Sequence, residues 1–575
     1  MKVMRGYFYG LEEQITNIEK WSQDKFVVFN HEAGTGKSTE THRIIGEMTK
    51  SQAHRVLYVQ KFLKDDELNN TVEVINRHAG RKVAVSYSGE DTRKVKAKEL
   101  LIDRQVICIT HQMYIQICKG EHQYLVEERD ILIIDEYPDL LEKLSISSNE
   151  IGQLWTECNK WDVPDIEEWA LTLRNLMDEI TACHQEMKFI DFAENRYRLV
   201  QMIKSAIGRL NDKRSNGYKG ILQKSLQLIK NGGFLFEDSF HTFDGNQQFV
   251  LLKNNIILDA NAGFDSRYEL CERFNIRKQD KAFEYARDTL HHIQVKTTKK
   301  GIQKFNELIQ EAMKRIQIDG KSGILFVTDK ANVEKLRQEI IGFFSPYGTN
   351  IEEIEERMKC KLSIDYFGNI IGVNHYREYD CVVLLKTPHY DYLTYALTYH
   401  YYKSMNQQPI DDVQLFKHQE VEEIRRSTVA GEMYQAIKRV NRDNSRLTVV
   451  YVFTDYQEAV DMVVKQLPNI RYIKTDFNGT KQKDGRDYDN TRRIDRSKKR
   501  KAELILLEAK GSGKPSIRKK ELRDQLEITN GSGLSHLMKR LEPFLKEHGI
   551  SLIGQRIVFQ NNLKDLENND LNESA

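Results

Sequence analysis

A glycine-rich segment near the start of the chain has residue types that bind phosphate. It reads His31-Glu32-Ala33-Gly34-Thr35-Gly36-Lys37-Ser38 and lies between the apolar run Phe26-Val27-Val28-Phe29 and a stretch of helical character. Its glycines allow backbone N–H groups to face an anion, and the N-terminus of the following helix attracts negative charge. We expect Lys37 to reach the terminal phosphates of a nucleotide and the Ser38 hydroxyl to bind Mg²⁺. A plain glycine-rich turn would need neither of these side chains, so the sequence predicts a phosphate loop with nucleotide contacts at Gly34, Thr35, Gly36, Lys37, Ser38 and Thr39.

A pair of carboxylates follows a second apolar run, in the sequence Ile131-Leu132-Ile133-Ile134-Asp135-Glu136. A carboxylate at the C-terminal end of a buried parallel strand lies where such sheets bind ligands. We expect Asp135 to hold Mg²⁺ and Glu136 to orient and deprotonate an attacking water. An acidic pair alone is an ordinary strand end, and the phosphate loop upstream gives it this chemical meaning.

Two arginines and a glutamine near residue 440 form a third candidate group. Gln435, Arg439 and Arg442 are spaced so that they share one face if the segment is helical. Such a face can reach across a cleft and stabilise the charge on a transferred phosphoryl group. Without the two other motifs, a solvated basic helix would be the simpler interpretation.

Composition excludes several classes of protein. The chain has 575 residues, of which 40% are hydrophobic and 30% charged, and no stretch approaches the roughly 20 apolar residues that a membrane helix needs. Its seven cysteines include no C-x-x-C pair, which argues against a zinc ribbon and a disulfide framework. The first residues lack the apolar core of a signal peptide, so we expect a cytoplasmic protein without membrane partners.

Apolar strand-like runs alternate with helical segments in two parts of the chain, which predicts an α/β fold with two parallel-sheet domains. Between them, helical patterns and three of the four tryptophans predict an α-helical insertion in the first domain. The expected boundaries are residues 1–140 and 236–265 for the first domain, 141–235 for the insertion, 266–480 for the second domain, 481–514 for a basic linker with a helix, 515–560 for a small winged-helix domain and 561–575 for an acidic disordered tail.

The basic linker and the small domain after it have features of a nucleic-acid-binding region. Residues 481–520 contain 15 basic and 6 acidic side chains, which favours a polyanionic partner, although a solvated linker would have the same charge. Helix, turn, helix and strand pair then follow in the order of a winged helix. Leu534, Leu537, Leu541 and Leu545 form one apolar stripe, which leaves Lys539 and Arg540 on the face of a recognition helix. Docking of a protein partner is the alternative use of such a domain.

Together these motifs resemble those of superfamily 2 helicases and nucleic-acid translocases. The phosphate loop resembles their motif I, Asp135-Glu136-Tyr137-Pro138 their DEAD/DEAH-type motif II, and residues 435–442 their motif VI. His31 replaces the first glycine of the phosphate-loop pattern, and Lys438 stands where motif VI usually has glycine. The resemblance covers roughly residues 7–466 apart from the insertion, and it implies two RecA-like domains that bind ATP and Mg²⁺ in their cleft.

Weaker motifs extend the resemblance. Residues 257–262 are similar to a motif III of the Leu-Asp-Ala-Thr form, with Asn261 in place of threonine. Motifs Ia, IV and V and the strand-end motif before motif II imply nucleic-acid contacts at Lys61, Thr110, His111, Thr328 and Asn374. The resemblance also implies a nucleotide contact at Gly372 and an adenine contact at Gln14, although a surface glutamine would explain Gln14 as well.

The motifs lead us to expect an ATP-dependent helicase or translocase that acts on nucleic acid, with DNA favoured over RNA. Two alternatives remain open at this point. The first is a nucleic-acid-dependent ATPase that remodels a protein complex without separating strands, and the second is an RNA helicase. A protein partner could bind through the helical insertion or the winged helix.

Overall fold

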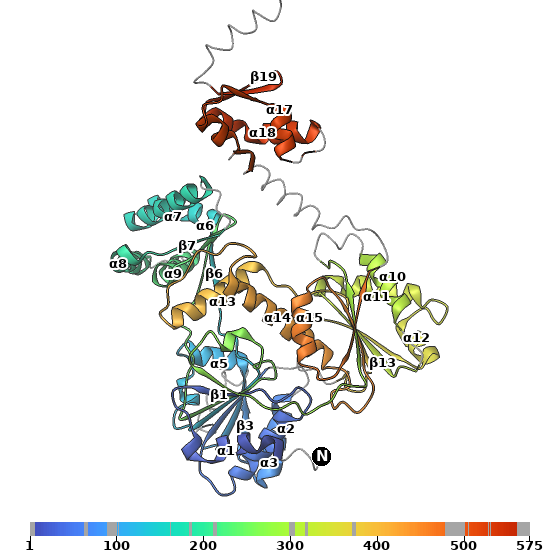
Figure 1. Cartoon of the computed structure of the whole chain (residues 1–575). Helices are drawn as coiled ribbons and strands as arrows, with labels where there is room; N and C mark the ends of the chain where they lie inside the picture. The colour runs from blue at the N-terminus through green and yellow to red at the C-terminus, as the bar shows by residue number, and fades with distance from the viewer. Residues whose placement is uncertain are drawn as a thin grey trace, which may run out of the picture. The chain divides into compact units, whose positions relative to one another are not determined.

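The computed structural model describes most of the chain, in two compact units that span Met1–Phe477 and Asn478–Ala575 (Figure 1). The described residues are 6–61, 67–88, 101, 103–161, 163–182, 187–210, 216–297, 305–316, 320–370, 375–477, 501–503, 505–526, 528 and 531–559. None of the helices within these ranges is long and apolar enough to span a membrane.

Lobe 1 of the first unit is a seven-stranded parallel sheet with the strand order β11-β1-β10-β5-β2-β4-β3. Its strands are β1 (Phe26–Phe29), β2 (Val56–Gln60), β3 (Ala84–Tyr87), β4 (Val106–Thr110), β5 (Ile131–Asp135), β10 (Asn254–Leu258) and β11 (Phe274–Arg277). Its helices are α1 (Tyr9–Thr16), α2 (Lys37–Met48), α3 (Glu67–Ala79) and α5 (His111–Cys118).

Both faces of the lobe 1 sheet are covered, which explains why its strands are almost entirely apolar. Successive side chains of a strand point to opposite faces. In β1, Phe26 and Val28 share a core with the buried side chains of α5, whereas Val27 and Phe29 share a core with those of α1, α2 and α3. The apolar runs of the sequence are therefore strands between two helical layers.

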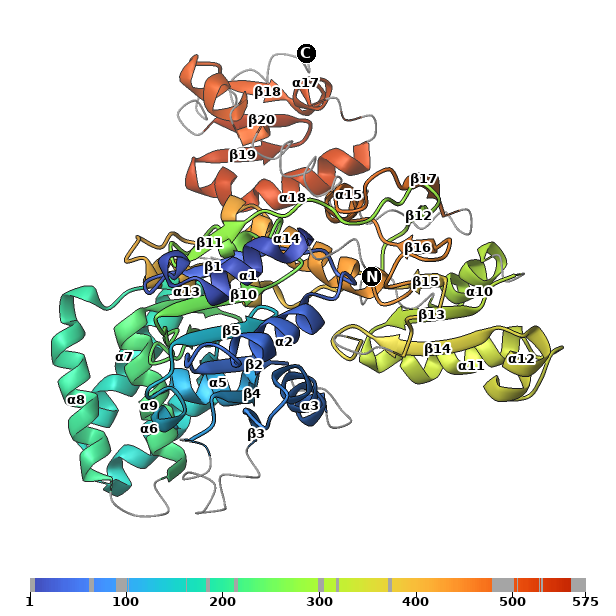
Figure 2. The same cartoon turned by 90° about the horizontal axis from the view of Figure 1, so that it is seen from below.

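Lobe 2 repeats this plan with a six-stranded parallel sheet in the order β14-β13-β15-β16-β12-β17. Its strands are β12 (Thr289–Gln294), β13 (Gly323–Thr328), β14 (Lys361–Tyr366), β15 (Cys381–Leu384), β16 (Val449–Phe453) and β17 (Arg471–Asp476). One face packs on α10 (Phe305–Arg315), α11 (Val333–Phe343) and α12 (Ile351–Met358), which Figure 2 shows beside β13 and β14. The other face packs on α14 (Gln419–Ile437) and α15 (Gln457–Lys465).

An inserted domain separates β5 from β10. It contains α6 (Ser148–Trp161), α7 (Pro164–Ala182), α8 (Arg196–Arg209) and α9 (Asn216–Asn231), together with the strands β6 (Lys143–Ser147), β7 (Lys188–Ile190), β8 (Gly233–Phe236) and β9 (Ser239–Phe243). These strands form an antiparallel sheet in the order β6-β9-β8-β7. The insertion is thus helical as expected but also contains a sheet, whose strands of three to five residues are too short to stand out in the sequence. Because β9 pairs with β6, the inserted domain extends beyond the expected boundary at residue 235.

Helix α13 (Tyr392–Met405) belongs to the second domain in sequence, where it packs on Val421 and Ile424 of α14, and it also reaches the first domain. Its residues share one core with Phe234 of the inserted sheet and another with lobe 1. His400 Nε2 contacts the Asn231 carbonyl oxygen at 2.8 Å, and Lys143 Nζ donates to Thr394 Oγ1 at 2.5 Å. The tyrosines that recur at helical spacing along this helix are buried in the core: Tyr392, Tyr395, Tyr399 and Tyr402.

The second unit contains β18 (Ser516–Arg518), α17 (Lys519–Gln525), α18 (Gly531–Glu547), β19 (Ile550–Ile553) and β20 (Arg556–Phe559). Its strands form an antiparallel sheet in the order β18-β20-β19. The four leucines of the predicted stripe on α18 are buried in its core, and Lys539 is exposed. The Arg540 side chain, most of the basic linker and the acidic tail lie outside the described residues.

Tyr402 tests the assignment of α13 to the core. Its side chain is 1% exposed, and its hydroxyl has no hydrogen-bond partner among the described residues. We expect Tyr402→Ala to lower the free energy of unfolding by about 3–5 kcal/mol, as for other large buried aromatic side chains. Tyr402→Phe should leave stability equal or raise it by about 1 kcal/mol, because it removes an unpaired buried hydroxyl. Urea unfolding of both variants measures this, and a stable Tyr402→Ala protein would contradict the assignment.

Candidate functional site

The loop between β1 and α2 has the geometry of an anion-binding turn. Gly34 and Gly36 have φ values of +91° and +88°, a left-handed conformation that glycine adopts without strain. Thr35 fixes the turn through its backbone N–H and its Oγ1, which donate to the Glu32 carbonyl oxygen at 3.3 and 2.8 Å. Helix α2 begins at Lys37, so its free N–H groups and its positive dipole end face the loop.

The Asp135 carboxylate lies beside this loop because β1, β10 and β5 are neighbours in the sheet and end at the same edge. Ser38 Oγ donates to Asp135 Oδ2 at 2.5 Å, and Tyr58 Oη donates to the same oxygen at 3.2 Å. Asp135 Oδ1 is buried and accepts no hydrogen bond from any residue that the structure describes. A hydroxyl and a free carboxylate oxygen side by side are ligands suited to Mg²⁺. No group of three or more acidic, histidine or cysteine ligands occurs among the described residues.

Glu136 follows Asp135 in a left-handed conformation with φ +71°. Burial alone would raise the pKa of its carboxyl group, but the positive charges of Arg439, Lys37 and Lys61 outweigh burial and lower it. The side chain is therefore an ionised carboxylate, and it is only partly exposed. That is the state a general base needs before it accepts a proton.

Lobe 2 supplies the opposite wall of the site. Burial lowers the pKa of Arg439 to about 10, while the Glu136 carboxylate opposes this change. The Arg442 backbone comes so close to the loop that a Cβ atom on Gly34 would lie 1.8 Å from the Arg442 carbonyl oxygen. Gln435 Oε1 and Arg439 Nε are buried without a partner among the described residues. The structure therefore brings the expected loop, carboxylate and arginines together.

The three residues of motif VI do not share one helix face as expected. Helix α14 ends at Ile437, and Lys438 follows as its C-cap. Asn441 then adopts a left-handed φ of +41°, and its side-chain amide donates to the Arg446 carbonyl oxygen and to Thr448 Oγ1. These contacts turn the chain away from the helix axis. The arginines reach the site from the turn after the helix, and only Gln435 lies on α14 itself.

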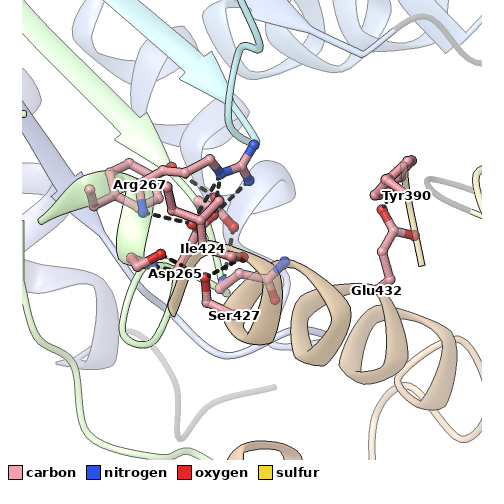
Figure 3. A network of polar contacts seen from close by, with 10 residues as sticks. Asp265, Arg267, Tyr390, Ile424, Ser427 and Glu432 are labelled. Carbon is pink, nitrogen blue, oxygen red and sulfur yellow. Dashed lines mark hydrogen bonds and ion pairs between the residues drawn. The ribbon is translucent and has the colours of Figure 1, made fainter. Parts of the chain in front are cut away.

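A turn of lobe 1 after β10 contacts α14 directly (Figure 3). Ser266 Oγ lies 2.8 Å from Ser427 Oγ of α14. Arg267 donates from Nε and Nη2 to the Asp265 carboxylate and lies 4.0 Å from the centre of the Tyr137 ring. Burial alone would lower the pKa of Arg267, but the Asp265 charge outweighs burial and raises it. The turn thus connects the tyrosine after Glu136 with lobe 2.

The segment that resembles motif III lies in the same region. Tyr268 Oη donates to Asp259 Oδ2 at 2.8 Å, and the Asn261 backbone N–H donates to Asp259 Oδ1 at 2.9 Å. The Asn261 side chain lies against Gly431 of α14. The Asp259 carboxylate therefore fixes the turn after β10. The residues that follow in this turn contact lobe 2.

Comparison with known proteins identifies the fold. No protein-family profile and no curated protein sequence matches the chain. Among solved structures, Xpd4 of S. tokodaii aligns with a TM-score of 0.50 and 14% identity over 82% of this chain and 99% of Xpd4. The MrfA helicase solved with DNA and AMPPNP has a TM-score of 0.40 and 11% identity over 96% of this chain and 59% of its own. S. cerevisiae Dbp5 solved with RNA and ADP BeF3 has a TM-score of 0.36 and 11% identity over 85% of this chain and 95% of its own.

The chain shares the fold of Xpd4 and has two RecA-like parallel-sheet domains. Lobes 1 and 2 are its RecA-like domains, and the site just described lies between them. The α/β class expected from the sequence is confirmed. The identity to these structures is too low to carry over any activity.

Several residues with sequence-predicted roles in this helicase fold have other partners in the structure. Gln14 is buried, and its Nε2 donates to Lys20 O and Asn254 Oδ1, so the structure does not bring it to the nucleotide site. Thr110 caps α5 by accepting a hydrogen bond from the Met113 backbone.

His111 contacts the Asp135 carbonyl oxygen at 2.9 Å, so its ring lies against the strand end that carries the carboxylates. Burial is also the main cause of the lowered pKa of His111. Thr328 is buried at the end of β13. Gly372 and Asn374 lie outside the described residues.

The network around Glu32 was not expected from the sequence. Its carboxylate accepts a hydrogen bond from Tyr285, which in turn accepts one from Lys438. The only sequence signal was the departure of Lys438 from the motif VI pattern.

Arg267 provides a test of how the turn after β10 is held. Arg267→Lys keeps the charge but loses the two-pronged contact with Asp265 and the planar contact with Tyr137. We expect it to lower the free energy of unfolding by about 1–3 kcal/mol. Arg267→Met should cost about 3–5 kcal/mol, because the Asp265 carboxylate would stay buried without its partner. Equal melting temperatures for wild type and Arg267→Met would disprove this account.

Proposed function

We propose that this chain is an ATP-hydrolysing helicase or translocase that acts on nucleic acid, with DNA favoured over RNA. The observation that supports it most is the approach of Arg439 of lobe 2 to Glu136 of lobe 1. A motor needs residues of both lobes at one phosphate, because only then does the loss of that phosphate change how the lobes contact each other. The helicase fold supplies the two lobes on which this proposal rests.

Each residue of the site has a role in the proposed reaction. The phosphate loop and Lys37 bind the phosphates of ATP, and Ser38 and Asp135 hold Mg²⁺, which neutralises phosphate charge when bound. Glu136 accepts the proton of the attacking water. Arg439 and Arg442 stabilise the negative charge that develops on the transferred phosphoryl group. Release of the phosphate weakens the attraction of the arginines for lobe 1, so the lobes separate and move along the strand.

Nucleic acid would cross both lobes and reach the C-terminal unit. Lys61 and Asn374 remain proposed contacts, by resemblance to the helicase motifs, whereas burial removes Thr328 from this set. We interpret the C-terminal unit as a winged helix whose helix α18 approaches DNA with Lys539 and Arg540, supported by the basic residues 481–514 before it. A protein partner bound through the inserted domain or the C-terminal unit would be another use of these surfaces.

The proposal predicts an ATPase that depends on nucleic acid. We expect turnover to rise when single-stranded DNA is added and to depend on Glu136, so that Glu136→Gln lowers kcat about 10²–10⁴-fold while ATP still binds. A titration with single-stranded DNA, duplex DNA, forks and RNA measures this, with strand displacement on forks as a second readout.

Each alternative gives a different result in that experiment. Stimulation by RNA alone would favour an RNA helicase. Stimulation without strand displacement would favour an ATPase that remodels a protein complex. Normal turnover by Glu136→Gln would refute the assignment of the base, and the absence of ATP hydrolysis with every nucleic acid would refute the proposed function.

The C-terminal unit can be tested by removing it. A chain that ends at Phe477 keeps both lobes and all residues of the proposed ATP site. We expect it to retain basal ATPase but to bind DNA more weakly, with the slope of log K against log salt reduced by about 1 for each phosphate that the truncated chain no longer neutralises. The matched change in the full chain, Lys539→Glu with Arg540→Glu, should show part of this effect. Unchanged affinity and slope after truncation would instead favour protein docking.

A further inference from the structure

A buried hydrogen-bonded network crosses from lobe 1 to lobe 2 beside the phosphate loop. Tyr285 Oη donates to Glu32 Oε1 and accepts a hydrogen bond from Lys438 Nζ at 2.8 Å. Glu32 Oε2 accepts hydrogen bonds from the backbone N–H groups of Ala282 and Phe283 at 2.8 and 3.2 Å. One carboxylate thus has three donors, and the phenol connects it to the ammonium group.

The members of this network come from three parts of the chain. Glu32 belongs to the phosphate loop of lobe 1 and Lys438 caps α14 of lobe 2. Tyr285 lies between β11 and β12, in the segment that connects the two lobes. The network therefore joins both walls of the cleft to the connector between them.

Both charged groups are removed from water. Glu32 is 1% and Lys438 4% exposed, and Lys438 also lies over the Phe283 and Tyr285 rings at 5.0 and 4.8 Å. A buried charge that is separated from its partner is strongly unfavourable, because neither water nor another group replaces the missing interaction. Tyr285 packs in the core of lobe 2, where its backbone N–H donates to the Pro468 carbonyl oxygen. Separation of the lobes would therefore remove Glu32 from Tyr285 and from its two backbone donors, so the network opposes that separation.

We propose that Glu32, Tyr285 and Lys438 are positioning residues that hold the phosphate loop against Arg439 and Arg442 before any nucleotide binds. The contact between Gly34 and the Arg442 carbonyl oxygen is the arrangement that the network maintains. The closure of the lobes in the absence of nucleotide depends on the network alone. The effect of the network on ATP turnover rests on the proposed function.

Two variants break the network in different ways. Tyr285→Phe keeps the ring over Lys438 and removes only the bridging hydroxyl, and Lys438→Met removes the charge while keeping a long side chain. Lys438→Arg restores the charge. Lys281→Met is the matched control, because Lys281 lies near Glu32 but donates to Gln466 and not to the network.

The distance between the lobes is measured by fluorescence resonance energy transfer between two dyes, one on each lobe of the full chain. Lys50 of lobe 1 and Gln338 of α11 are exposed, and clickable unnatural residues at these positions avoid the native cysteines. Without nucleotide, we expect wild type, Lys438→Arg and Lys281→Met to share one high transfer efficiency. Tyr285→Phe and Lys438→Met should shift the molecules to a lower efficiency. Melting curves confirm that each variant is folded.

Steady-state kinetics supply the second readout. Tyr285→Phe and Lys438→Met should lower kcat at least tenfold with the KM for ATP within about threefold, because the phosphate loop is intact and only the approach of the arginines is impaired. Lys438→Arg should recover most of kcat.

The two proposals fail in different ways. Equal transfer efficiency of wild type, Tyr285→Phe and Lys438→Met without nucleotide would overturn the positioning role, even in an active ATPase. Absence of ATPase in wild type would refute the proposed function, while the transfer measurement would still decide whether the network closes the lobes.

Discussion

The close approach of two backbones from different lobes constrains the whole cleft. The Arg442 carbonyl oxygen occupies the space that a side chain on Gly34 would need, and Gly34 also has a left-handed φ. Only glycine meets both requirements without strain. Because no side chain separates the backbones here, charged groups of the two lobes come close to each other. There the charges of Glu136 and Arg439 act on each other strongly enough to influence both pKa values.

Sheet topology explains why so few residues suffice to build this site. The order β1-β10-β5 places the phosphate loop, Asp259 and Asp135 at adjacent strand ends. The turn after β10 then reaches α14 through Ser266 and Ser427. A change in the contacts of one strand end is thereby transmitted to lobe 2 through covalent and hydrogen-bonded neighbours, without a separate coupling element. Helix α13 adds a second connection, since it packs on α14 of lobe 2 and also on lobe 1 and the inserted sheet.

Local residue patterns predicted the parts of the site that depend on one strand and its following turn. The phosphate loop and Asp135 belong to this class, because a buried strand and a helix N-terminus determine their geometry. The sequence did not predict that α14 ends before Arg439, since Asn441 stops it through contacts with Arg446 and Thr448. The sheet of the inserted domain was also missed, because its strands are short and are paired by residues far apart in the chain. The contact of His111 with Asp135 was not predicted either, because it joins the ends of β4 and β5, which β2 separates in the sheet.

Lys438 stands where motif VI usually has glycine, and its contacts show how the cleft accommodates the lysine. A lysine in place of glycine adds a charge to a closed cleft, and that charge needs a partner. The partner is a residue of another motif, Glu32, reached through the neutral hydroxyl of Tyr285. A phenol can donate to a carboxylate and accept from an ammonium group at once, so one side chain of the connector satisfies both charges. The three residues therefore constrain one another, and a change at one of them leaves a buried polar group of another without its partner.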